Sequence, residues 1–124
     1  MILRQLESED RGGSARGALN STTSVEVVAT PDAGFTRRSK LWVQNKDTAA
    51  VILRLRVTVA GPTHYEWYSE SLALDNPGTA AGGHVAVDCP DLQNGETISA
   101  VLDAAIATNQ PAWVSSWVDV PVAS

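Results

Sequence analysis

Three side chains that could act together in catalysis or metal binding lie close in the sequence, at His84, Asp88 and Cys89. An imidazole, a carboxylate and a thiolate are groups from which zinc sites and cysteine nucleophiles are built. His84 and Asp88 lie on one face of a segment that alternates like a strand, and a strand places residues four apart at a separation of about 13 Å. That distance is too long for one shared metal ion without further ligands. We therefore interpret these residues as a solvated histidine and a partly buried thiol, and we expect no metal site and no cofactor.

A second cluster, the run His64-Tyr65-Glu66-Trp67-Tyr68, could bind sugar. Aromatic rings present flat apolar faces on which a sugar ring can stack, and the carboxylate adds a hydrogen-bond acceptor. Tyr65, Trp67 and Tyr68 would then form a ligand face. Alternatively, the segment is a strand that buries Trp67 and leaves its polar side in water.

No familiar catalytic motif stands in the sequence. Gly12 and Gly17 lie five residues apart as in a phosphate-binding loop, but Ala18 stands where that loop needs lysine. No serine occupies a Gly-x-Ser-x-Gly turn, and the scattered carboxylates form no pair that the sequence alone can bring together. We therefore predict that the chain is not an enzyme.

The composition indicates one soluble domain that does not bind nucleic acid. The chain has 124 residues, of which 44% are hydrophobic and 19% charged, the mix of an ordinary folded domain. Its net charge of −5 disfavours binding to a phosphate backbone, and its single cysteine excludes an internal disulfide framework. No apolar run approaches the roughly 20 residues that span a bilayer, and the first residues do not resemble a signal peptide. We expect a protein made in a reducing cytoplasm, with neither nucleic acid nor a membrane as partner.

The elements that must position these side chains are strands from residue 22 onward. The clearest is 51–59, where Val51, Leu53 and Leu55 alternate with Ile52, Arg54 and Arg56, which places the first set in a core and the arginines outside. Turn residues separate such segments about every 10–15 residues, which is typical of an antiparallel sandwich. We predict an all-β, single antiparallel β-sandwich, jelly-roll-like, of about seven or eight strands. The other expected strands are 24–30, 40–45, 64–74, 83–89, 97–107 and 112–120.

The segment 97–107 has a second interpretation. Its alanine-rich part, 101–108, could form a short helix, since alanine has the highest helix propensity. The alternation of Ile98, Ala100 and Leu102, continued by Ala104 and Ile106, favours a strand instead.

The tryptophans point to an interface. The chain has four of them, and in 112–120 Trp113 and Trp117 fall on the face opposite Val114 and Val118. If the valines face the core, two large rings face solvent, which is typical of protein interfaces. We therefore predict an interface at Trp113 and Trp117. The alternatives are a register in which the tryptophans form the core, or cover by the first residues of the chain.

Residues 1–21 differ from the domain that follows, 22–124. The segment 7–17 is polar, holds three glycines and follows neither a period of 2 nor one of 3.6. We expect a flexible arm, because glycine loses the most backbone entropy on ordering. The apolar tip of this arm would dock on a neighbouring subunit through Ile2, Leu3 and Leu6; the alternative is a frayed terminus.

Two long segments resemble small virion structural proteins of tailed bacteriophages. Residues 25–34 and 39–55 read VEVVATPDAG and SKLWVQNKDTAAVILRL. They follow that family's order of a strand, a turn with proline and glycine, a strand ending in asparagine, a small polar turn and an apolar strand. Residues 72–74, 85–88 and 94–100 continue the likeness.

The resemblance implies an architectural and non-enzymatic role in a virion, with no catalytic residues to carry over. Capsid decoration is the first expectation, and a head–tail or tail part is the alternative. The expected partners are the major capsid protein or neighbouring copies in a homo-oligomer. Two further classes stay open from the residues: a carbohydrate-binding module that uses the aromatic strand, and an intracellular adaptor that binds a host protein.

Overall fold

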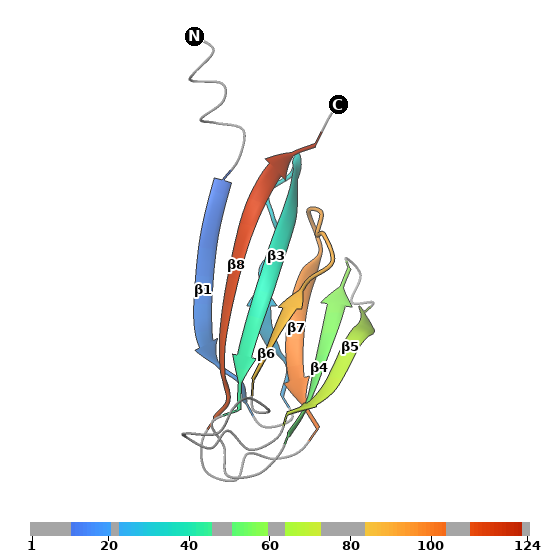
Figure 1. The fold of residues 1–124 in the computed structure, drawn as a ribbon. Coiled ribbons are helices and arrows are strands. Elements are labelled where there is room, and N and C mark those ends of the chain that lie inside the picture. The colour runs from blue at the N-terminus through green and yellow to red at the C-terminus, as the bar shows by residue number, and fades with distance from the viewer. Residues whose placement is uncertain are drawn as a thin grey trace.

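The computed structural model describes residues 11–20, 23–45, 51–59, 64–72, 84–103 and 110–122, which contain eight β-strands. Within these ranges no helix is long and apolar enough to cross a membrane. The strands, all labelled in Figure 1 except β2, are β1 (Arg11–Ala18), β2 (Val25–Val28), β3 (Phe35–Gln44), β4 (Val51–Thr58), β5 (His64–Leu72), β6 (His84–Asp88), β7 (Thr97–Leu102) and β8 (Ala112–Pro121).

The strands form two four-stranded antiparallel sheets, ordered β1-β8-β3-β6 and β2-β7-β4-β5. The pairs β4–β5, β3–β6, β2–β7 and β1–β8 are nested along the chain, like the rungs of one long hairpin. Successive pairs fall in alternate sheets, so the hairpin is rolled up into a sandwich. Eight strands in two such sheets make a jelly roll. The predicted fold class is confirmed.

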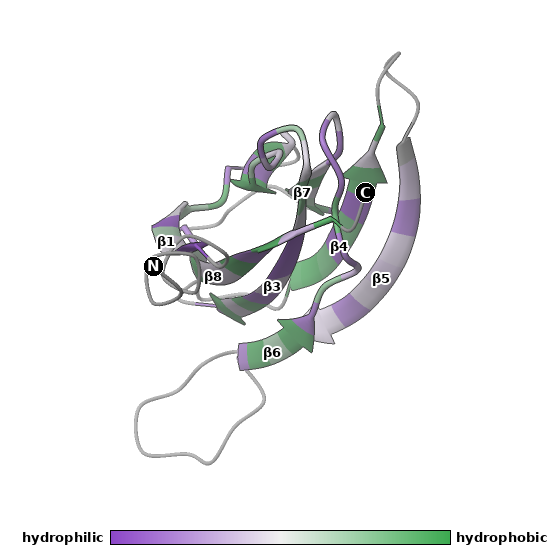
Figure 2. Cartoon of the chain, turned by 90° about the horizontal axis from the view of Figure 1, so that it is seen from above, coloured by the Kyte–Doolittle hydropathy of each residue, from purple (hydrophilic) through white to green (hydrophobic). Residues whose placement is uncertain are grey.

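The core lies between the sheets and follows the period of two. On β4 the inner residues Val51, Leu53, Leu55 and Val57 are each at most 2% exposed, whereas Ile52 is 38% exposed. In Figure 2 β4 alternates between hydrophobic and hydrophilic colours, while the neighbouring edge strand β5 is mainly hydrophilic. The predicted orientation of this strand is confirmed.

The other predicted strands are present with shifted ends. β3 begins at Phe35, five residues before the expected start, and β5 ends at Leu72. β7 buries Ile98, Ala100 and Leu102, as predicted for a strand. The expected continuation of β7 over residues 104–107 lies outside the described residues.

The prediction of an irregular arm over residues 1–21 is wrong for β1. This strand pairs with β8 along its whole length, with Gly13 opposite Trp117 and Gly17 opposite Trp113. A Cβ atom on Gly13 would lie 2.6 Å from the Trp117 ring, and one on Gly17 would lie 3.1 Å from the Trp113 ring. The glycines therefore make room for two indoles on the inner face, which explains why the strand lacks an apolar pattern of its own.

The two faces of β8 are the reverse of the prediction. Trp113 is 8% exposed and belongs to the core, whereas Val114 and Val118 are 42% and 44% exposed. The inner face tolerates a polar side chain because that side chain is satisfied: the Ser115 hydroxyl is completely buried and donates to the Val27 carbonyl at 2.7 Å. The period of two was right, and the choice of the inner face was wrong.

A buried ion pair completes the inner face of β8. Arg37 on β3 donates from Nε and Nη2 to the two carboxylate oxygens of Asp119, at 2.7 and 2.8 Å, and from Nη1 to the Ala29 carbonyl at 2.9 Å. The guanidinium carbon lies 4.5 Å from the centre of the Trp117 ring. The hydrogen bonds from Arg37 lower the pKa of Asp119, against the opposing effect of burial. Asp119 can therefore face the core as a charged group.

Candidate functional site

The outer face of the β1-β8-β3-β6 sheet carries an exposed apolar surface. Because Trp113 and Ser115 face inward, the alternation turns Val114, Val118 and Val120 of β8 outward. Trp42 of β3 is 42% exposed on the same face, directly opposite Val114. Trp42, Val114, Val118 and Val120 together are named the outer apolar strip.

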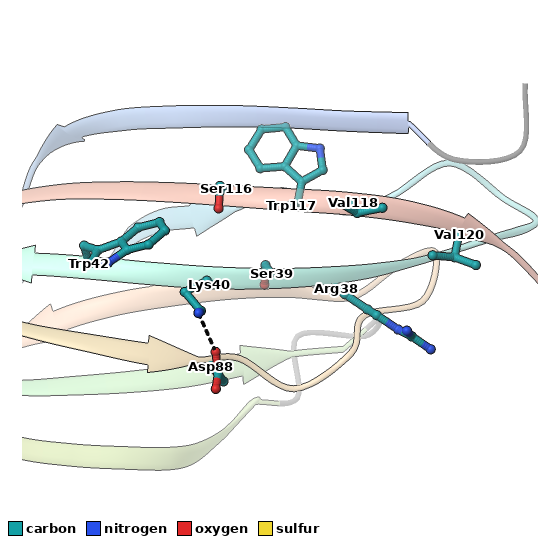
Figure 3. A pocket seen from close by; sticks show the side chains of 9 residues that line it. All are labelled: Arg38, Ser39, Lys40, Trp42, Asp88, Ser116, Trp117, Val118 and Val120. Carbon is teal, nitrogen blue, oxygen red and sulfur yellow. Dashed lines mark ion pairs between the residues drawn. The ribbon is translucent and has the colours of Figure 1, made fainter. Parts of the chain in front are cut away.

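A shallow hollow of about 690 Å³ lies on this face. Figure 3 shows Trp42 toward one end of the hollow and Val118 and Val120 toward the other, with Ser116 and Lys40 between them. Ser116 lies directly opposite Lys40 in the register. The short serine side chain leaves the surface low beside the tall indole, so the strip presents a projection next to a depression.

Cations border the outer apolar strip. Arg38 and Lys40 point outward from β3, and Arg16 is exposed on β1. Two of them have acidic neighbours: Arg38 Nε lies 3.7 Å from an Asp91 oxygen, and Lys40 Nζ lies 3.5 Å from an Asp88 oxygen (Figure 3 shows the second pair). All four of these side chains are more than half exposed. Such ion pairs contribute little to stability, so both cations can exchange their partners for a new one.

The predicted interface tryptophans lie elsewhere. Trp113 is buried in the core, and Trp117 is half-buried beside Gly13 and the Arg37 guanidinium. These two rings seat β1 on β8 and do not form an exposed pair. The predicted arm tip, at Ile2, Leu3 and Leu6, lies outside the described residues.

The predicted ligand face is divided by a bulge in β5. Tyr65 is 52% exposed, but Trp67 and Tyr68 pack against the core. The register shifts at Trp67, so these consecutive residues both contact the sandwich, with ring centres 5.7 Å apart. Burial, followed by the hydrogen bond to Glu70 and its charge, raises the pKa of Tyr68 to about 12. The three rings do not form one open platform, and sugar binding stays a prediction that depends on Tyr65.

The histidine, carboxylate and thiol of the first cluster are placed as expected from a strand. His84 and Asp88 are exposed on the outer face of β6, opposite Gln44 and Lys40. Cys89 is half-buried, and burial raises the pKa of its thiol. Among the described residues, no group of three or more potential metal ligands lies together.

Trp42 is the residue of this site that sequence reasoning missed. It stands between Leu41 and Val43, and such a run of three apolar residues does not say which of them face the core. The neighbouring residues did contain a signal. Arg38, Lys40 and Gln44 lie an even number of positions from Trp42 and therefore share its face of the strand. A tryptophan that alternates with the apolar set and shares its face with charged residues belongs to the surface.

Comparisons with known proteins identify the fold. No protein-family model matches the chain, and no curated protein matches its sequence. The structure is similar to a chain from the acidic-stable capsid of the Helicobacter pylori bacteriophage KHP30, with a TM-score of 0.58 and 15% identity over 93% of this chain and 90% of that chain. It is also similar to a chain from Bacillus endospore appendages, which form a family of disulfide-linked pili, with a TM-score of 0.56 and 8% identity over 92% of this chain and 88% of that chain. Both likenesses extend over nearly the whole jelly roll.

Proposed function

We propose that the chain is a non-enzymatic structural component of a virion, and most specifically a capsid decoration or stabilising protein. The observation that carries this proposal is the outer apolar strip. Trp42, Val114 and Val118 are each more than 40% exposed, although the sandwich has a complete core of its own. Adjacent exposed apolar side chains that a protein does not need for its own core mark an interaction surface. The likeness to a phage capsid chain and the resemblance of the sequence support the virion as the setting.

The size of the strip suits a part that is present in many copies. Covering apolar surface contributes roughly 25 cal/mol per Å² removed from water, so a few side chains give only a weak single contact. A particle repeats the contact many times, and linked contacts bind far more tightly than each one alone. The partners under this proposal are neighbouring copies or the major capsid protein.

The charge and the cysteine content also fit a virion better than a pilus. A net charge of −5 keeps the chain away from packaged nucleic acid by repulsion. Linking each subunit to two neighbours by disulfides needs at least two cysteines, and this sequence has only Cys89, which is half-buried. Non-covalent assembly through the strip is therefore the mode that we propose.

Incorporation into particles tests this function. Tagged wild-type chain would be expressed during particle production, and gradient-purified particles would be quantified by mass spectrometry. We expect a fixed copy number in the particle fraction, a strong reduction for Trp42→Ser, and no change for Ile52→Ser, a similarly exposed position on the other sheet. Wild-type chain that stays in the soluble fraction would overturn the proposal.

A carbohydrate-binding module is the second candidate, because Tyr65 is 52% exposed beside Trp67 and Tyr68. A titration with sugars followed by tryptophan fluorescence separates the two. A structural protein gives no response, whereas a response that is lost in both Tyr65→Ala and Trp67→Ala would favour the module.

A further inference from the structure

We propose that the outer apolar strip is the docking site for residues 1–10 of a neighbouring copy of the chain. This inference rests on the proposed function, since it names the partner of the same surface. The occupant is deduced from charge, from the order of side chains, and from where β1 begins.

The face around the strip is richer in cations than the acidic chain as a whole. The chain carries −5. Around the strip, three cations (Arg16, Arg38 and Lys40) stand with three carboxylates (Asp88, Asp91 and Glu96, the last beside Val120 and Arg38), so this face is locally neutral. Exposed cations beside an apolar centre can pair with a segment that is both acidic and apolar.

Residues 1–10 have that composition, in a matching order. Their sequence is MILRQLESED, in which an apolar part is followed by an acidic part and Arg4 is the one cation. On β3, the apolar Trp42 is likewise separated along the strand from the cations Arg38 and Lys40. The apolar part of the segment can therefore cover Trp42 while its acidic part reaches the two cations. The apolar side chains are those of Ile2, Leu3 and Leu6, and the acidic ones are those of Glu7, Glu9 and Asp10.

The start of β1 directs this segment toward a neighbour. Arg11 lies opposite Asp119 near the end of β8, and its side chain is held by an ion pair with Asp32 at 3.3 Å and by the Phe35 ring, whose centre lies 3.9 Å away. Preceding residues that continue the direction of β1 leave the sandwich at that end, away from Trp42. Ten extended residues span about 33 Å, enough to reach an adjoining subunit. Covering Trp42 and Val114 of the same copy would require the chain to reverse its direction at Arg11, whereas Val118 and Val120 lie near that end of β1.

Photo-crosslinking of the full-length chain tests the inference. A chain with Leu3→p-benzoylphenylalanine would be mixed with an equal amount of ¹⁵N-labelled chain that lacks the photoreactive group. After irradiation, mass spectrometry identifies which peptides are joined and whether each is light or heavy. We expect light-to-heavy crosslinks to the peptides that contain Trp42 or residues 114–120.

Matched variants sharpen the result, with folding checked by circular dichroism. We expect Trp42→Ser to lower the crosslink yield about tenfold, the size of loss typical of a central interface tryptophan, and Ile52→Ser on the other sheet to leave it unchanged. Reversing the charge of the two β3 cations that border the strip, with Arg38→Glu and Lys40→Glu, should also lower the yield. Reversing the segment with Glu7→Lys and Glu9→Lys in that background should restore it.

Each outcome decides the matter. Crosslinks within light chains alone would show that the segment folds back on its own copy, and crosslinks to other regions, or none up to the solubility limit, would overturn the site. The two proposals also fail separately. A chain that enters particles without strip crosslinks keeps the proposed function and loses this inference. A chain that forms the crosslinks but never enters particles does the opposite.

Discussion

β4 and β8 both alternate between an inner and an outer face, but β4 turns its aliphatic side chains inward whereas β8 turns its valines outward. On β4 the inner residues are aliphatic and the outer ones include Arg54 and Arg56. On β8 the inner set includes Ser115 and Asp119, while valines face solvent on the outside. Alternation therefore defines two faces of a strand, but the neighbouring strands decide which of them becomes the core.

The neighbours of β8 make its polar face suitable for burial. On one side, β1 presents glycines that leave space for the Trp113 and Trp117 rings. On the other side, β3 supplies the Arg37 guanidinium that neutralises Asp119. The outer face is thereby free to carry the apolar strip, which is the part of the molecule that we assign to assembly.

Removing the buried cation of the β8 face should lower the unfolding free energy more than any other substitution that we propose. Arg37→Ala leaves Asp119 as an unpaired buried charge, and breaking a buried pair in this way costs about 3–5 kcal/mol of unfolding free energy. Chemical denaturation followed by tryptophan fluorescence measures the loss. The control is Arg38→Ala, an exposed neighbour on the same strand, which should change the unfolding free energy by less than about 0.5 kcal/mol.

The same pair predicts the acid behaviour of the protein. The pKa of Asp119 is lowered in the folded state. The contribution of the ionised Asp119 to the unfolding free energy is therefore complete above the unfolded pKa of about 3.9, and it is lost as pH falls through the lower pKa of the folded state. The gap in unfolding free energy between wild type and Arg37→Ala should therefore narrow below about pH 4. A gap that stays constant into strong acid would show that Asp119 is not the charged partner.

Glycine substitutions in β1 test the seat for the tryptophans. Gly13→Ala places a Cβ atom 2.6 Å from the Trp117 ring, whereas Gly12→Ala meets only the Trp117 carbonyl oxygen at 3.5 Å. We expect Gly13→Ala to cost about 1–3 kcal/mol through overpacking and Gly12→Ala to be neutral or slightly stabilising. Equal melting temperatures for the two variants would contradict the close packing of the Trp117 ring against Gly13.

The sequence allowed the sandwich and the orientation of β4 to be predicted, because its hydrophobic period there has only one reading. It did not allow β1 to be predicted, since a strand whose inner positions are glycine has no apolar pattern. One pairing signal was present: Gly13 and Gly17 have the same spacing as Trp113 and Trp117. Turning that match into a strand pair requires knowing that segments a hundred residues apart lie side by side.

The inner face of β8 was beyond reach for a related reason. A sequence shows that Asp119 is charged, but its burial depends on a guanidinium that only the fold brings to it from β3. Without that partner, burying the valines costs less free energy than burying an unpaired Asp119. The outer apolar strip, and with it the candidate site, follows from the face that the partner determines.

The smallest effect should come from one substitution made on two strands. Val57 is 1% exposed on β4 and Val118 is 44% exposed on β8. We expect Val57→Thr to cost about 1–2 kcal/mol of unfolding free energy, because it buries a hydroxyl group in a core that was not arranged to hydrogen-bond it. Val118→Thr should stay within about 0.5 kcal/mol. Thermal unfolding of both variants measures the difference. A larger loss for Val118→Thr would show that the valines of β8 face the core, as the sequence had predicted.

The most direct test of the assembly surface is hydroxyl-radical footprinting of the chain, free and in purified particles. Trp42, at 42% exposure on the strip, and Tyr65, at 52% exposure on β5, are both open to oxidation in the free chain. We expect assembly to protect Trp42 strongly and to leave the oxidation rate of Tyr65 unchanged. An unchanged rate at Trp42 together with protection of Tyr65 would contradict it and would move the interface to the other sheet.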